Sequence, residues 1–230
     1  MEIFRHRSQR EAEAKLDQDI EEVNRLLEDP AHQLSMMPER VVEQARRNGR
    51  VDTVPGASGS FGTVPTNPIP VNGTVGAMAW LSRLQTRQGE SLVFHRVGLL
   101  HGLEVYEALS LTRANWFLFF LDPVHLGASR QAPEGFRLMA EGRLFHGVGR
   151  LMPRFPGDLE RIVASYDEVF RLATVAPNKV LNQLASREPE RPVAQRLKLE
   201  WLAHQIELSG TVQPRSDALG TAAVTGGEPA

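Results

Sequence analysis

The chain has 230 residues, a formal net charge of −2 at pH 7, 41% hydrophobic residues and no cysteine. The lack of cysteine excludes disulfides, thiolate zinc sites and cysteine nucleophiles. A slightly acidic chain has no reason to present the basic surface that nucleic acids and anionic membranes attract, so we expect neither as a partner. The length fits one domain with appendages.

The N-terminus is charged and contains no apolar region of the kind found in secretory signals. The longest strongly apolar run, residues 116–121, is far shorter than the about 18 residues of a transmembrane helix. We therefore expect a soluble, cytoplasmic protein. Its basic residues are nearly all arginine, which is typical either of anion recognition or of a coding bias, and their scatter along the chain favours the bias.

Residues 1–48 are expected to form a helical N-terminal arm. Ser8 and Glu11 have the spacing of a capping box, and Pro30 should end this first helix near Asp29. Between them an apolar seam recurs at steps of four, three and four: Leu16, Ile20, Val23 and Leu27. The seam either docks on the rest of the chain or binds another protein, a second copy included. A second helix should run from Pro38 to Asn48.

Residues 49–73 are rich in proline and glycine and are expected to connect the arm to the main domain. The run GASGSFG lacks the Lys-Ser/Thr of a phosphate-binding loop and is interpreted as a flexible connection. The run NPIPVNG is expected to lie extended along the surface. A helix over Val75–Thr86 should follow, with a hairpin across Asn72-Gly73 as the alternative.

The densest apolar region, Ser91–His125, predicts three strands. The connections between them are short, so the strands should pair antiparallel. A further hairpin is expected to turn at Glu141-Gly142. The five predicted strands are Ser91–Val97, Leu103–Leu111, Trp116–Asp122, Phe136–Ala140 and Arg143–Leu151.

The C-terminal part is predicted to be helical. Residues 159–173 place apolar residues on one face, which should cover the aromatic face of the sheet. Shorter helices are expected over 178–187 and from Pro192 onward, and residues 210–230 have too little to bury and should be a disordered tail. Residues 74–209 are thus predicted to form an α+β domain, an antiparallel sheet of about five strands backed by C-terminal helices.

The candidate site lies on the second face of the sheet. Pairing Val97 with Leu103 and Leu111 with Trp116 places His95 and Asp122 opposite Val105, with Glu107 on a diagonal. One histidine and two carboxylates on an apolar face suit acid–base catalysis by His95, Glu107 and Asp122. With His125 as a ligand they also have the composition of a two-histidine, one-carboxylate metal site. The alternative is structural, with His95 and Glu107 as a cross-strand pair and Asp122 as a turn cap.

Two functions from different classes follow. The first is a binding or assembly protein without a catalytic motif, acting on a protein partner or a second copy through the N-terminal helix. The second is a small hydrolase or lyase, metal-dependent or acid–base, that uses His95, Glu107 and Asp122. The sequence identifies no cofactor and does not decide whether the protein is an enzyme.

Overall fold

The computed structural model describes residues 21, 25, 27–110, 115–140, 147–157 and 190–211. Several predicted elements lie outside these residues: most of the first helix, the helices over 159–173 and 178–187, and the tail beyond residue 211. None of the described helices combines the length and the apolar character needed to cross a bilayer.

After the helical residues 27 and 28 come two short helices, α2 (Pro30–Ser35) and α3 (Glu39–Asn48). The carboxylate of Asp29 accepts the N–H groups of Ala31 and His32, and Pro30 occupies the first turn of α2, where no N–H is required. Pro30, interpreted from the sequence as the end of one helix, therefore also begins another. The predicted helix after Pro38 is confirmed, and it ends at Gly49 with a φ of 69°.

The connecting segment is tied to the sheet. Gly62 N–H donates to Asn67 O at 2.7 Å, and Gly62 O accepts from Phe120 N–H at 2.9 Å. The strand β1 (Ile69–Pro70) then pairs parallel with β5, and Ile69 and Val71 are fully buried. The expectation that this run lies on the surface is wrong, because its apolar residues fill the core at the edge of the sheet.

The main sheet has the strand order β1-β5-β4-β3-β7. Its central strands β3 (Leu92–Leu100), β4 (Leu103–Ser110) and β5 (Trp116–Asp122) are antiparallel. Both outer pairings, of β1 with β5 and of β7 (Gly147–Val148) with β3, are parallel. The α+β class is thus confirmed, but the fully antiparallel sheet is wrong, because chain segments distant in sequence add the edges.

A second, two-stranded sheet joins β2 (Leu84–Thr86) to β6 (Phe136–Leu138). The described parts of the hairpin predicted over 136–151 therefore belong to different sheets. The local sequence is compatible with pairing between the two predicted strands. In the structure β6 pairs instead with β2 and β7 with β3, and both partners are remote in sequence. Residues 141–146, between β6 and β7, lie outside the described chain.

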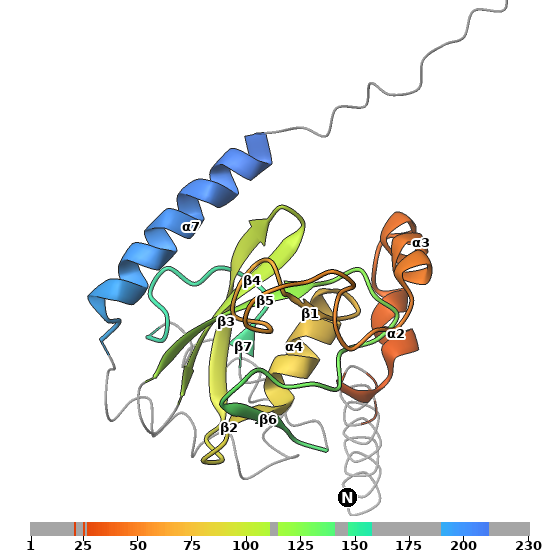
Figure 1. The fold of residues 1–230 in the computed structure, drawn as a ribbon, viewed down its shortest axis with the longest axis horizontal. Coiled ribbons are helices and arrows are strands. Elements are labelled where there is room, and N and C mark those ends of the chain that lie inside the picture. Colours follow the sequence, from red (N-terminus) through yellow and green to blue (C-terminus); the bar gives the residue numbers. More distant parts are fainter. Residues whose placement is uncertain are drawn as a thin grey trace, which may run out of the picture.

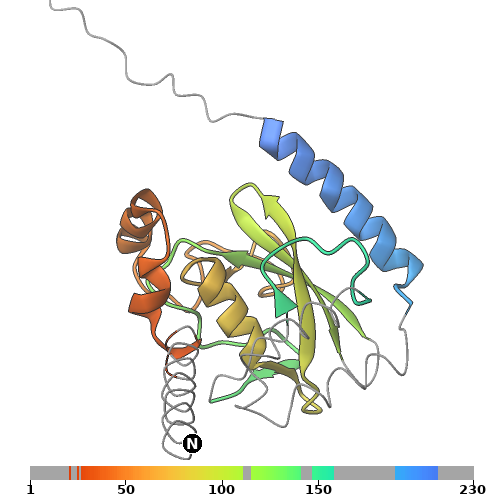
Figure 2. The same cartoon turned by 180° about the vertical axis from the view of Figure 1, so that it is seen from behind.

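Two helices cover the opposite faces of the main sheet (Figures 1 and 2). The helix α4 (Gly73–Arg83) packs on the aromatic face, with Trp80 and Leu81 against Phe94, Tyr106 and Phe119. The sequence assigned this face to residues 159–173, and among the described helices α4 covers it. The helix predicted from Val75 is confirmed over its first part, and its last three residues form β2.

The second face is covered by α7 (Val193–Thr211). Leu202 and Ile206 pack there on a cluster that includes Val105 and Phe120. A Cβ added at Gly98 would lie 2.9 Å from the Cδ1 atom of Ile206. The glycine in β3 therefore allows the helix to approach the strand closely.

Candidate functional site

His95 and Glu107 lie directly opposite each other on β3 and β4, on the face that the sequence predicted. The predicted pairing of His95 with Val105 is wrong by two residues. The sequence predicted a turn of five residues, but the turn between the strands contains only His101 and Gly102, both at positive φ, which shifts the register by three. A bulge between Arg96 and Gly98 shifts it back by one, which leaves a difference of two. An even shift changes the neighbours of a residue but keeps it on its face.

Both ring nitrogens of His95 are occupied. Its Nε2 atom lies 2.9 Å from Oε2 of Glu107, and its Nδ1 atom accepts the N–H of Met152 at 3.2 Å. Because Nδ1 accepts an N–H donor, the ring proton in this arrangement lies on Nε2 and is donated to Glu107. The ring also packs on Phe155, with the two ring centroids 4.4 Å apart.

Glu107 is the centre of the cluster. Arg191 donates to both of its oxygens, from Nε at 2.9 Å and from Nη2 at 2.7 Å, and Gln195 Nε2 donates to Oε1 at 3.1 Å. Burial by itself would raise the pKa of the Glu107 carboxyl. The hydrogen bonds from His95, Arg191 and Gln195 and the charge of Arg191 outweigh burial, so the pKa is lowered. We call these four residues the Glu107 cluster.

His95 and Glu107, the centre of the Glu107 cluster, are buried and their hydrogen bonds are complete. His95 is 2% exposed and Glu107 is 0% exposed. Each oxygen of Glu107 accepts two hydrogen bonds, and neither nitrogen of His95 has a lone pair left for a substrate proton. These hydrogen bonds connect β3, β4, the segment around Met152 and the start of α7. A buried polar network with this connectivity is typical of a structural role.

Asp122 and His125 form a separate pair. Oδ2 of Asp122 lies 3.0 Å from Nε2 of His125, and His125 is buried. In β5, Asp122 is four residues beyond Leu118, the residue opposite Glu107, which is about 13 Å along the strand. The structure therefore brings His95 to Glu107 and Asp122 to His125, and does not bring the two pairs together. No three metal-binding side chains are grouped to hold an ion within the described chain.

Comparison of the chain with protein-family models, with curated proteins and with solved structures finds no match. The function must therefore be inferred from the site and the surfaces of this chain alone.

Sequence reasoning missed Arg191 and Gln195. They are 84 and 88 residues from Glu107 along the chain, and the only local signal is their position around Pro192, at the start of a helix. A buried Glu107 with one histidine partner could have indicated a missing cation, because a buried carboxylate requires a charged or multiple hydrogen-bonding partner.

A second buried carboxylate lies on the aromatic face. Oε2 of Glu104 accepts the Tyr106 hydroxyl at 2.9 Å, its other oxygen accepts the Thr74 hydroxyl, and Arg96 lies 3.5 Å away. Burial raises the pKa of Tyr106, and the neighbouring Glu104 charge raises it further. Tyr106 thus remains a neutral donor, and this group fastens α4 to the sheet.

Proposed function

We propose that this chain is a non-catalytic assembly protein that associates with a second copy of itself through the outer face of α7. The observation that carries the proposal is a row of large apolar side chains exposed on this helix. The saturated Glu107 cluster favours a binding function over the hydrolase or lyase alternative, because it leaves neither His95 nor Glu107 free to act as an acid or a base.

The outer face of α7 carries a row of large apolar residues, with the exposed His204 among them. Val193 is 61% exposed, Leu197 60% and Trp201 56%, and Leu208 has about half of its surface exposed. At about 100° of rotation per residue, these four residues fall within an arc of about 80°. Leu202 and Ile206, which pack on the sheet, lie on the opposite side. A helix that is apolar on both sides is typical of a helix covered on both sides.

Charge favours a second copy in an antiparallel arrangement. Along one edge of the outer face, Arg196 lies in the first half of α7, Glu200 near its middle and Glu207 in the second half. In a two-fold antiparallel pair centred near Trp201, each edge faces the same edge of the other copy, so Arg196 of one copy meets Glu207 of the other. A parallel pair would bring this edge toward Lys198 on the other edge. There Arg196 and Glu200 lie equally far from Lys198 along the helix and offset each other, and Glu207 has no basic residue of α7 at its own height.

The same balance of charge argues against a membrane surface as the occupant. The charged residues along α7 are Arg196, Lys198, Glu200 and Glu207, which sum to zero. Helices that bind anionic lipid typically carry an excess of lysine and arginine on the polar face. The helix is about 28 Å long, which makes the interface smaller than the about 800 Å² per partner of a standard complex, so we expect micromolar self-association.

Sedimentation velocity on the full chain, from about 1 µM to about 500 µM, tests this proposal over the range in which a small interface dissociates. The wild type should shift from monomer to dimer. Trp201→Asp should weaken the dimer at least about tenfold, because buried tryptophans contribute most to interfaces. The exposed position of Trp201 predicts that the variant keeps the melting temperature of the wild type.

Met36→Asp is the matched control, because Met36 is equally exposed but lies at the end of α2, away from α7. It should dimerise like the wild type. A wild type that stays monomeric throughout, or a dimer that Trp201→Asp leaves unchanged, contradicts the proposal. So does a monomer that sediments with phosphatidylcholine–phosphatidylserine vesicles in a manner dependent on Trp201, since that result would make a membrane the occupant.

A further inference from the structure

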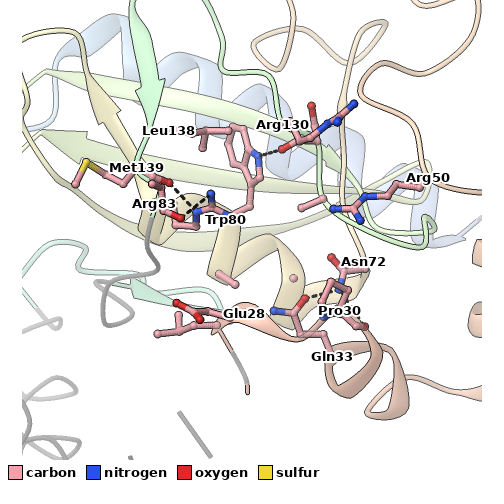
Figure 3. A pocket seen from close by; sticks show the side chains of 16 residues that line it. Glu28, Pro30, Gln33, Arg50, Asn72, Trp80, Arg83, Arg130, Leu138 and Met139 are labelled. Carbon is pink, nitrogen blue, oxygen red and sulfur yellow. Dashed lines mark hydrogen bonds between the residues drawn. The ribbon is translucent and has the colours of Figure 1, made fainter. Parts of the chain in front are cut away.

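A cavity of about 570 Å³ opens on the side of α4 that faces away from the Glu107 cluster. Its lining comes from α2, α4, the residues after α3, the segment after β5 and the end of β6. Figure 3 shows the labelled side chains around it. The volume lies within the range of about 300–1,000 Å³ that is typical of small-molecule sites.

The lining is positively charged. It contains three arginines, Arg50, Arg83 and Arg130, and one acidic residue, Glu28. Asp52 neutralises Arg130 through an ion pair of 2.6 Å. Arg83 donates to the main-chain oxygens of Met139 and Ala140, which hold its guanidinium in place but carry no charge to offset it.

Arg50 is the arginine available to a ligand. It makes no hydrogen bond or ion pair within the part of the chain that the structure describes. Asp52, whose carboxylate it influences through charge, is held by Arg130. In Figure 3 its guanidinium points into the space between Trp80 and Asn72. A guanidinium directed into a cavity without a counter-ion favours a carboxylate or phosphate group there.

The remaining lining suits an apolar body with a polar edge. The indole N–H of Trp80 donates to Ser129 O at 2.8 Å, which fixes the ring as one wall, and Leu27 and Leu138 add apolar surface. The cavity thus offers a cation beside an apolar wall.

We propose that this cavity binds a small organic anion, a carboxylate or phosphate on an aromatic or similarly apolar body, with the charged group held by Arg50. The site is separate from the outer face of α7, so it adds a ligand to the assembly function and does not depend on it. The sequence alone favoured coding bias as the reason for the many arginines. In this proposal one of them, Arg50, has a role in binding the anion.

Two anionic probes and one neutral probe test the proposal by isothermal titration calorimetry. Phenyl phosphate and phenylacetate present the two head groups on the same ring, and benzyl alcohol presents the ring without charge. The wild type should bind at least one anion at millimolar concentration or below and should bind benzyl alcohol at least about tenfold more weakly, because a hydrogen bond to a charged group is worth about 10- to 100-fold in affinity. The stronger anion identifies the head group.

Arg50→Gln should weaken binding of that anion by about 10- to 100-fold without lowering the melting temperature, since the side chain supports no described hydrogen bond. Arg87→Gln is the matched control, because Arg87 is exposed on a turn and does not line the cavity. Binding of neither anion, equal binding of benzyl alcohol, or binding that Arg50→Gln leaves unchanged overturns the proposal. A loss of equal size in Arg87→Gln also overturns it, because the effect would then be one of net charge.

Discussion

Arg191 donates hydrogen bonds to both carboxylate oxygens of Glu107, although 84 residues separate the two in the chain. The contact joins the start of α7 to the central strand β4. Gln195, in the first turn of the helix, donates to the same carboxylate, and Leu202 and Ile206 pack further along. The buried side of α7 is thereby fixed along its length, and this fixes which residues the helix turns outward.

The first prediction concerns the energy of this contact. Glu107→Gln should lower the free energy of unfolding by about 2–4 kcal/mol, because it leaves the partly buried Arg191 without its counter-charge. In a double-mutant cycle with Arg191→Met, the coupling between the two sites should be about 1–3 kcal/mol. Urea unfolding of the four proteins measures both quantities.

The Asp52–Arg130 pair provides the control for this cycle. It has the same chemistry, with Arg130 donating to both oxygens of Asp52, but the Arg130 side chain is 79% exposed. Solvent screens such a pair, so its coupling should be clearly smaller than that of Glu107 with Arg191. Equal coupling in the two cycles would contradict a stabilising role for the buried pair.

The second prediction concerns the free energy of unfolding at acidic pH. The lowered pKa of Glu107 means that the unfolded chain binds its proton more readily than the folded chain. Its contribution to stability is therefore complete above the unfolded pKa of about 4.5 and is lost as the pH falls through the lower folded value. Between pH 7 and pH 3, the wild type should lose more unfolding free energy than Glu107→Gln. Hydrogen bonds and charge from Arg130 lower the pKa of Asp52 too, but both proteins keep this group. Parallel curves would show that Glu107 does not contribute.

The third prediction concerns the aromatic face. Tyr106→Phe removes the hydroxyl that donates to the buried Glu104 and should lower the free energy of unfolding by about 1–3 kcal/mol. Adding Glu104→Gln should cost less in this background than in the wild type, because the two groups share one hydrogen bond. Thermal or urea unfolding gives both differences, and strict additivity would contradict the shared bond.

Strand alternation was enough to predict the faces of the sheet. His95 and Glu107 share a face, and Phe94, Tyr106 and Phe119 share the other, because a register error of two residues does not turn a strand over. The exact neighbours could not be predicted in the same way. They depend on the two-residue turn at His101-Gly102 and on a bulge, neither of which hydrophobic alternation reveals.

Contacts that join distant parts of the chain were beyond the sequence. The parallel partners β1 and β7, the α4 cover of the aromatic face and the Arg191 contact all depend on segments whose local pattern does not specify where they dock. The cavity residues illustrate the same limit. Arg50, Arg83 and Arg130 are far apart in the sequence, and only the fold brings them around one space.

The last prediction concerns the orientation of the paired helices. Arg196→Glu should weaken the dimer, because it places two acidic residues face to face at each end of an antiparallel pair, and Glu207→Arg should weaken it through two basic residues. The double variant Arg196→Glu with Glu207→Arg should dimerise as the wild type does, since the charges are exchanged and again opposite. The two residues are 11 positions apart, or about 16 Å along the helix, so a direct contact within one copy does not explain the recovery. Sedimentation at low salt enlarges these differences, because exposed charges are then less screened. Weakening in the double variant equal to the sum of the two single changes would contradict the antiparallel arrangement while leaving the role of Trp201 open to its own test.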